Sequence, residues 1–197
     1  MKRNRDLEFL YEIGCFRFLQ RTWRQFLNPD SQNISEHTMR VIWLALLIAN
    51  KERVKDEEKI MKMALVHDLP ESRTGDVNYL SRQYTKRDED KAVKDIFEGT
   101  AFKEEYIKLW REYEKRWTIE AKIVKDADNL DVDLEILEQE IKGFKKDRWI
   151  VTREAVYKSL HTKTAKKLWH EIHTSDPHDW HLLGRNRLVA GDWKKLL

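Results

Sequence analysis

Helical periodicity is the feature that most constrains the fold of this 197-residue chain. Apolar residues recur at intervals of three and four along most of the sequence, whereas the alternating pattern of a half-buried strand is scarce. Only six glycines and three prolines interrupt these patterns. No linker, repeat or low-complexity tract divides the chain. We therefore expect one all-α domain, a helical bundle that spans residues 1–197.

Caps and turn residues predict where the helices begin and end. Asn33 followed by Glu36 is a capping-box pattern, so a helix should begin there. Its buried face should follow helical spacing through Val41, Leu44, Ala45 and Ile48. His37 lies four residues before Val41 and should share that face. Pro70 disfavours helical geometry at the preceding residue, which predicts a break near Leu69.

The remaining helices are expected from periodicity alone. They should cover residues 5–26, 56–69, 88–99, 102–115, 118–143 and 152–173. The first of them should bury Leu7, Leu10, Tyr11, Phe18 and Leu19. A loop-rich tail should follow and end in a short amphipathic piece.

Charge and composition exclude several classes of protein. The 38 basic and 35 acidic residues leave a net charge of only +3, so we expect no polymeric nucleic acid as partner. No run of about 18 apolar residues is present, and the N-terminus lacks the apolar segment of a secretory signal, so we expect no membrane partner. The lone Cys15, expected in the core, permits no intrachain disulfide. This fits a cytoplasmic protein.

Ionisable residues interrupt the apolar segment "ALVHDLPESRTGD", residues 64–76. His67 and Asp68 fall at the expected end of a helix, where they could meet His37 and a downstream aspartate. Two imidazoles and two carboxylates suit a divalent transition metal (Mn, Co, Ni, Zn or Fe, with Mg less favoured) and leave coordination positions open for water and substrate. Spacing alone does not select the fourth ligand among Asp126, Asp128, Asp131 and Asp133. The pattern is typical of a hydrolytic site.

The segments "SEH", "HDLPE..TGD" and "VKDAD.L" resemble the HD-domain metal-dependent phosphohydrolases, most closely their 5'-deoxynucleotidase group. The order and spacing match over residues 23–138, and residues 20–145 form the family-like core, with a C-terminal helix and tail over 150–197. The resemblance implies these metal ligands: His37, His67, Asp68 and Asp128. It also implies catalytic roles for Glu71 and Asp76, with Glu71 moving a proton to or from water or the leaving sugar oxygen.

The same resemblance implies a substrate pocket lined by Trp23, which would favour a 2'-deoxy sugar. The family pattern places a phosphate-binding arginine directly before this tryptophan, but here that position is Thr22. Arg21 is our first candidate to replace it and Arg24 the second. Thr74, in the "TGD" motif, is a further candidate substrate contact.

The resemblance implies hydrolysis of deoxynucleoside 5'-monophosphates, with a small-molecule nucleotide as substrate and a homodimer as assembly. Two alternatives stay open: an HD hydrolase for another phosphorylated metabolite or an alarmone, and an inactive nucleotide-binding protein. A rival metal site could form from clustered C-terminal histidines, namely His170, His173, His178 and His181. We expect these to be surface residues without a ligand.

Overall fold

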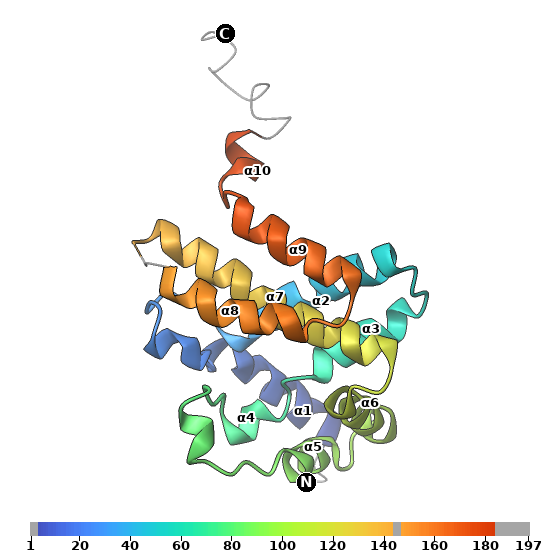
Figure 1. Cartoon of the computed structure of the whole chain (residues 1–197). Helices are drawn as coiled ribbons and strands as arrows, with labels where there is room; N and C mark the ends of the chain where they lie inside the picture. The colour runs from blue at the N-terminus through green and yellow to red at the C-terminus, as the bar shows by residue number, and fades with distance from the viewer. Residues whose placement is uncertain (1–3, 144–146, 184–197) are drawn as a thin grey trace, which may run out of the picture.

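The computed structural model describes residues 4–143 and 147–183, and it is helical without strands in that part of the chain (Figure 1). Within these residues, ten α-helices are separated by turns and three short 3₁₀ helices. The α-helices are α1 (Arg5–Gly14), α2 (Ile34–Glu52), α3 (Glu57–Val66), α4 (Glu71–Thr74), α5 (Glu89–Phe97), α6 (Lys103–Lys115), α7 (Ile119–Ile141), α8 (Asp147–Ser159), α9 (Lys163–Thr174) and α10 (Asp179–Leu182). The 3₁₀ helices are η1 (Cys15–Phe18), η2 (Thr22–Gln25) and η3 (Ser81–Gln83). The all-α prediction is confirmed.

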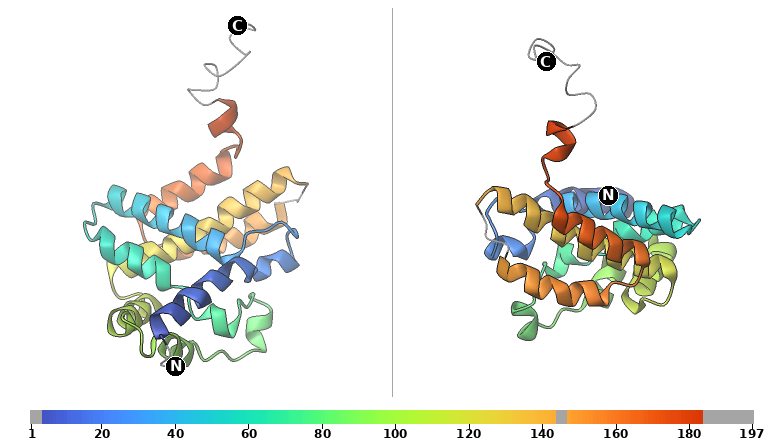
Figure 2. Two further views of the ribbon diagram at one scale, coloured as in Figure 1. Left: turned by 180° about the vertical axis from the view of Figure 1, so that it is seen from behind. Right: turned by 45° about the horizontal axis from the view of Figure 1, so that its top comes forward.

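The long helices α2 and α7 lie at the centre of the molecule. They pack against each other, α3 packs against both, and α9 covers the other side of α7 (Figures 1 and 2). Most residues of α7 are buried, including acidic ones. A helix with this many buried positions must pair its carboxylates with partners on neighbouring helices, because an unpaired buried charge is costly.

The start of α2 follows the sequence prediction closely. The Asn33 side chain accepts a hydrogen bond from the Glu36 N–H, and the Glu36 side chain accepts one from the Asn33 N–H. The expected inner stripe is buried: Val41, Leu44, Ala45 and Ile48. His37, in the first turn, is fully buried on the same face. The cap therefore fixes the register that carries this histidine into the core.

The prediction for the first helix was wrong in length and in its buried face. The helix ends at Gly14, tightens into η1, and gives way to extended backbone at Leu19. The backbone of residues 19–21 then pairs with residues 32–34, through Ile34 N–H to Leu19 O (2.9 Å) and Arg21 N–H to Gln32 O (3.4 Å). This pairing replaces the helical hydrogen bonds and places η2 beside the start of α2.

The apolar face of α1 is also different from the prediction. Four of the expected core residues are exposed: Leu7, Leu10, Tyr11 and Phe18. Phe9 and Ile13 pack against the core instead, with Phe16 and partly buried Leu19 after them. Cys15 is exposed rather than buried. The real helix is too short to carry one apolar stripe to Phe18.

The single helix expected over residues 152–173 is two helices, α8 and α9. Asp126 of α7 accepts hydrogen bonds from the backbone N–H groups of His161 and Thr162, both at 2.8 Å. The Thr162 side chain caps α9 by accepting from Ala165 N–H. These bonds replace helical ones at the break, and the chain turns back over α7. The amphipathic piece expected at the end of the chain lies outside the described residues.

The predicted break before Pro70 is present. Helix α3 ends at Val66, and residues 67–70 form a turn that leads into α4. His67 and Asp68 lie on this turn at the end of a buried helix. None of the described helices combines the length and apolar character needed to cross a membrane.

Candidate metal centre

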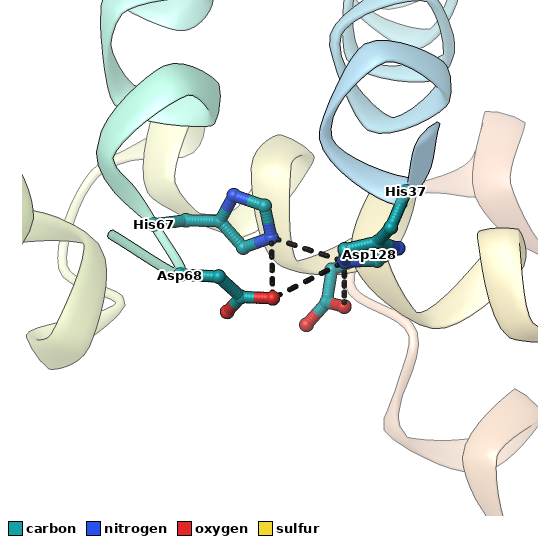
Figure 3. Close-up of side chains that lie close together, drawn as sticks. All are labelled: His37, His67, Asp68 and Asp128. Atoms are coloured by element: carbon teal, nitrogen blue, oxygen red, sulfur yellow. Dashed lines mark hydrogen bonds and ion pairs between the residues drawn. The ribbon is translucent and has the colours of Figure 1, made fainter. Parts of the chain in front are cut away.

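Four ionisable side chains from three distant segments point toward one another (Figure 3). They are His37 on α2, His67 and Asp68 on the turn after α3, and Asp128 on α7. Their ligand atoms lie within 4.8 Å of one another. His37 Nε2 lies 3.2 Å from His67 Nε2 and 3.3 Å from both Asp68 Oδ2 and Asp128 Oδ1. In the described part of the chain, this is the one group of three or more such residues able to hold a metal.

The spacing and chemistry of these atoms fit a bound divalent metal. Nitrogen and oxygen ligands at about 2.0–2.2 Å from one ion lie roughly 3.0–3.5 Å apart, and His37 Nε2 lies at such a distance from the nearest ligand atom of each of the other three residues. Two imidazole nitrogens and two carboxylates suit Zn²⁺ and the neighbouring first-row metals. Both histidines also turn the correct nitrogen inward. His67 directs Nδ1 to the Ala64 carbonyl oxygen at 2.7 Å, and His37 directs Nδ1 to Asp131 at 2.6 Å.

The electrostatic field at this point favours positive charge. Burial by itself would raise the pKa of Asp68, but the nearby His67 and His37 outweigh burial and hold that pKa well below its usual range. The pKa of Asp128 is likewise held well down against burial, chiefly by Lys125 and His37. Burial and Arg21 would lower the pKa of His37, yet bonds to carboxylates including Asp128 raise it to about 10. Carboxylates that favour an imidazolium also favour a metal cation.

The four aspartates of α7, which spacing alone could not separate, have four different surroundings. Asp128 lies in the cluster, and Asp126 binds the turn before α9, as described above. Asp131 contacts His37 from the side away from the cluster. Asp133 accepts from Arg153 Nε at 2.7 Å and Nη2 at 2.9 Å. Of these four aspartates, the structure brings Asp128 alone into the cluster.

A cavity of about 290 Å³ opens beside the cluster. Its wall includes Thr22 and most of the predicted site residues, three of the candidate ligands among them: Arg21, Trp23, His67, Asp68, Glu71, Asp76 and Asp128. Glu71, the first residue of α4, is buried, and its Oε2 has no hydrogen-bond partner. Its Oε1 lies 3.4 Å from Arg87 Nη1. Glu71 therefore lines the cavity with a carboxylate that is only partly satisfied by protein partners.

The environment of Glu71 makes its carboxyl a poor acid. Burial is the largest cause of a pKa well above the usual range, and the charges of Asp68 and Asp76 raise it further. Arg21 and Arg87 act in the opposite direction without cancelling these effects. Such a carboxyl can hold a proton closer to neutral pH than an exposed one.

Asp76 connects the "TGD" motif to η2. Its Oδ2 accepts hydrogen bonds from Thr22 N–H at 2.6 Å and Thr22 Oγ1 at 3.0 Å. Thr22 stands where the family pattern has arginine, and here its hydroxyl binds this aspartate. Trp23 follows it, half-buried in the cavity wall, with its ring 5.6 Å from Trp149 and 6.2 Å from Tyr79. Asp76 thus holds the segment that presents the tryptophan.

The two candidate arginines lie in different places. Arg21 is buried in the cavity wall, and its Nη1 donates to Asp68 Oδ2 at 3.0 Å. Arg24 is exposed and outside the cavity. Thr74 also lies outside the cavity wall, and its hydroxyl donates to the Pro70 carbonyl oxygen at 3.2 Å. Of the proposed phosphate contacts, the structure brings only Arg21 to the site.

Several cavity residues were missed by sequence reasoning. Lys125 Nζ donates to Asp128 Oδ2 at 2.6 Å, and the spacing of three residues on one helix was a signal for this pair. Tyr113 Oη lies 3.3 Å from the same oxygen, and the Arg116 guanidinium stacks 3.6 Å from the Tyr113 ring. Arg87 reaches Glu71 from the loop before α5. No local pattern marked these last three, because they approach from other helices and loops.

The C-terminal histidines do not form a comparable group. His170 and His173 pack against Trp169 on α9, and His173 Nε2 lies 3.3 Å from Asp133 Oδ1. His178 is half-buried just before the four-residue α10 and His181 is exposed on it, and His178 Nδ1 lies 2.8 Å from His181 Nε2. Among the described residues, none of these histidines belongs to a group of three or more side chains close enough to hold one metal ion.

Sequence comparison places these observations in context. A family model described as HD domain matches residues 13–173. The 5'-deoxynucleotidase HDDC2 of Danio rerio is 34% identical over 146 residues, which cover 70% of this chain and 71% of that protein. The 5'-deoxynucleotidase YGK1 of Saccharomyces cerevisiae is 30% identical over 149 residues, which cover 71% and 68%.

Solved structures share the same arrangement of helices. A conserved hypothetical protein from Pyrococcus furiosus superposes with a TM-score of 0.74 at 26% identity, covering 86% of this chain and 99% of that one. A predicted metal-dependent phosphohydrolase from Magnetospirillum magnetotacticum superposes with a TM-score of 0.66, covering 85% and 91%. At 22% identity, the second likeness is one of fold alone.

Proposed function

Because this chain belongs to the HD-domain family, we propose that it is a metal-dependent phosphohydrolase that converts deoxynucleoside 5'-monophosphates to deoxynucleosides and phosphate. Relatives named 5'-deoxynucleotidase, 30–34% identical over about 70% of the chain, support this substrate class. The observation that carries the proposal is the convergence of four ligand atoms beside a cavity lined by Glu71, a buried carboxylate whose Oε2 has no hydrogen-bond partner.

We assign the metal to His37, His67, Asp68 and Asp128. When bound there, a divalent ion supplies positive charge to the phosphoryl oxygens and lowers the pKa of water toward about 7. The nitrogen and oxygen ligands favour Mn, Co, Ni, Zn or Fe over Mg, which prefers an oxygen shell. Three of the four ligands, His67, Asp68 and Asp128, line the cavity, so a phosphate monoester can approach the metal from that side.

Glu71 is our candidate for proton transfer. Glu71 lines the cavity beside the ligands, its Oε2 has no hydrogen-bond partner, and its pKa is raised well above the usual range, so it holds a proton more readily than an exposed glutamate. In this proposal it accepts a proton from the attacking water or donates one to the sugar 5'-oxygen as the bond to phosphorus breaks. Such a role is typically worth about 10²–10⁴ in rate.

Arg21 and Trp23 are our candidates for substrate contact. Arg21 contributes a buried guanidinium that retains an unpartnered Nε, so it can bind a phosphate oxygen while still holding Asp68. Trp23 supplies an apolar wall suited to a deoxyribose that lacks a 2'-hydroxyl. Asp76 acts through Thr22 to hold both residues in place.

The test is phosphate release from a matched panel of deoxy- and ribonucleoside 5'-monophosphates. Each substrate is assayed after chelation and after addition of Mn, Co, Ni, Zn or Mg. We expect release from the deoxy forms that depends on added metal and is weakest with Mg. Absence of release from every monophosphate with every metal would remove the proposed activity.

We further propose that two copies of this chain associate through the outer face of α2. Met39, Trp43 and Leu47 recur at four-residue spacing and are 60%, 67% and 42% exposed, although the opposite face of the helix is buried in the core. A helix that is apolar on both faces requires cover on both. A second copy can supply that cover with an identical apolar face.

Light scattering on the intact protein tests this association. Trp43→Glu places a charge in the proposed interface, so we expect a monomer, whereas the wild type is a dimer. Trp117→Glu is the matched control, because Trp117 is 71% exposed in the turn between α6 and α7 and is not part of α2. A monomeric wild type would contradict the proposal.

We place the protein in the cytoplasm, because its single cysteine suits a reducing compartment.

A further inference from the structure

The two histidines of the metal centre differ in the group that holds their second ring nitrogen. His67 Nδ1 faces the backbone carbonyl of Ala64, which belongs to its own helix. His37 Nδ1 faces a carboxylate, Asp131 Oδ2, at 2.6 Å, and that carboxylate comes from another helix. Both His37 and Asp131 are fully buried. The first contact is local, whereas the second depends on the packing of α2 against α7.

Asp131 is itself held by a network of donors. The Arg40 Nε donates to Asp131 Oδ1 and the Gln32 side-chain amide donates to Asp131 Oδ2. Arg40 also reaches Glu138 on α7, with Nη1 2.6 Å from Oε1. A buried carboxylate is costly unless it is paired and hydrogen-bonded, and these partners meet that requirement. They also leave Asp131 little freedom to move away from His37.

We propose that Asp131 is a positioning residue for His37, and that Arg40 holds Asp131 in place. This inference rests on the proposed metal centre. The Asp131 carboxylate accepts the His37 Nδ1–H and thereby keeps the lone pair on Nε2, the nitrogen that faces the other three ligands. A hydrogen bond of this kind fixes the tautomer and orientation of a metal-binding histidine and raises its basicity.

The position of Asp131 on α7 explains how this helix can both supply a metal ligand and orient a ligand on α2. Asp131 follows Asp128 by three residues, so both side chains leave α7 on the same face. Asp128 contributes a ligand, and Asp131 orients a ligand that belongs to α2. Arg40 follows His37 by three residues on α2, so it meets Asp131 one turn along from the histidine. The two helices are therefore joined at the metal centre and directly behind it.

If Asp131 had a purely structural role, its substitution would lower stability without a specific loss of metal affinity. Another aspartate on α7 provides the control for this alternative. Asp133 is also fully buried and bound to an arginine, with Arg153 nitrogens at 2.7 and 2.9 Å, but it faces away from His37. Asp133→Asn therefore reports the cost of breaking a buried aspartate–arginine pair without disturbing a metal ligand. Asp131→Asn breaks a similar pair and also presents an amide to His37 Nδ1.

The experiment measures metal affinity without substrate, by competition between the full-length protein and a chelator for Mn²⁺ and Co²⁺. We expect Asp131→Asn to weaken affinity by about 10–100-fold, the usual effect of losing such a partner. Asp133→Asn should bind metal like the wild type, even where its melting temperature falls. Equal affinities for Asp131→Asn and the wild type would overturn the proposal. Because no turnover is involved, the result is independent of whether the proposed phosphatase activity is correct.

A second variant covers the outcome in which Asp131→Asn does not fold. Arg40 is partly exposed at its side chain, so Arg40→Gln disturbs the carboxylate without opening the core. We expect a weakening of metal affinity smaller than 10-fold, with recovery in Arg40→Lys. In the Zn²⁺-loaded wild type, nitrogen-15 histidine spectra should show His37 bound through Nε2 with a proton on Nδ1. Metal bound through Nδ1 would contradict the assignment.

Discussion

Two pairs of histidines lie at contact distance in this protein, and only one pair belongs to a metal-binding group. His37 and His67 approach to 3.2 Å between Nε2 atoms, and His178 and His181 approach to 2.8 Å. The second pair lies in the most histidine-rich part of the sequence, whereas members of the first are 30 residues apart. Local density of histidine therefore does not identify the site.

The surroundings of the two pairs explain the difference. His37 and His67 are buried, carry two carboxylates beside them and have each Nδ1 held by an acceptor. His178 is half-buried directly before the four-residue α10 and His181 is exposed on it, and His178 uses Nδ1 to contact His181. A metal bound at the first pair meets oriented ligands and a negative field. At the second pair, it would have to order flexible side chains in water.

Removing a ligand should produce the largest difference between the two pairs. His67→Ala and Asp68→Ala should each lose bound metal, and activity should fall by at least about 10³-fold, because the metal supplies several kcal/mol of transition-state stabilisation. A double variant, His178→Ala with His181→Ala, should keep both. Elemental analysis of protein purified without added metal, combined with phosphate release, checks this. If the double variant lost its metal while His67→Ala and Asp68→Ala kept theirs, the metal site would be the C-terminal pair instead.

Glu71→Gln should separate metal binding from catalysis within the buried site. The substitution keeps the size of the side chain and removes the exchangeable proton, so turnover should fall about 10²–10⁴-fold while metal content stays unchanged. Single-turnover phosphate release with metal-loaded protein measures the loss. A rate close to that of the wild type would exclude Glu71 from proton transfer.

The two neighbouring arginines should differ by a smaller amount. Arg21→Ala removes a buried charged donor from the cavity, and a charge-assisted bond is worth about 1.5–3 kcal/mol, so kcat/KM should fall by roughly 10–100-fold. Arg24→Ala should change kcat/KM less than about twofold, because Arg24 is exposed outside the cavity. Steady-state kinetics on both variants tests this. Equal losses would show that the cavity wall does not determine phosphate contact.

The smallest expected effect is on the melting temperature of Glu71→Gln, and it is a gain in stability rather than a loss of function. Burial raises the pKa of Glu71, so the folded state opposes its ionisation, and metal-free Glu71→Gln should melt at a higher temperature than the wild type at pH 7–8. Each 1 kcal/mol recovered corresponds to roughly 2–4 °C in a chain of this size.

The pH dependence of the difference in melting temperature between Glu71→Gln and the wild type provides the control. The advantage of Glu71→Gln should grow as pH rises from the pKa of an unfolded glutamate toward the raised pKa of Glu71 in the folded protein, and it should stay constant above that raised pKa. It should vanish below the pKa of an unfolded glutamate, about 4.3, where both states are protonated. Melting curves from pH 4 to 8 measure it. A constant difference at all pH values would mean that packing, rather than charge, separates the two proteins.

Local sequence signals predicted the parts of the fold that depend on neighbours along the chain. The capping box at Asn33 and the break before Pro70 are present, and both rest on contacts within a few residues. The extension of α1 to residue 26 and the single helix over 152–173 were wrong. In each case, backbone groups at the break bind distant partners, Gln32 and Asp126 among them. Periodicity does not report such partners.

The sequence by itself determined the helical class, the family and the kinds of residue that could bind a metal, because periodicity, caps and motif order are properties of the chain. The tertiary structure alone decided that Asp131 faces the back of His37, that Arg21 rather than Arg24 reaches the cavity, and that Tyr113 and Arg87 join it. Those outcomes depend on how α2, α3, α6 and α7 pack. Contacts between helices tens of residues apart are set by the shape of the whole core, which no short stretch of sequence encodes.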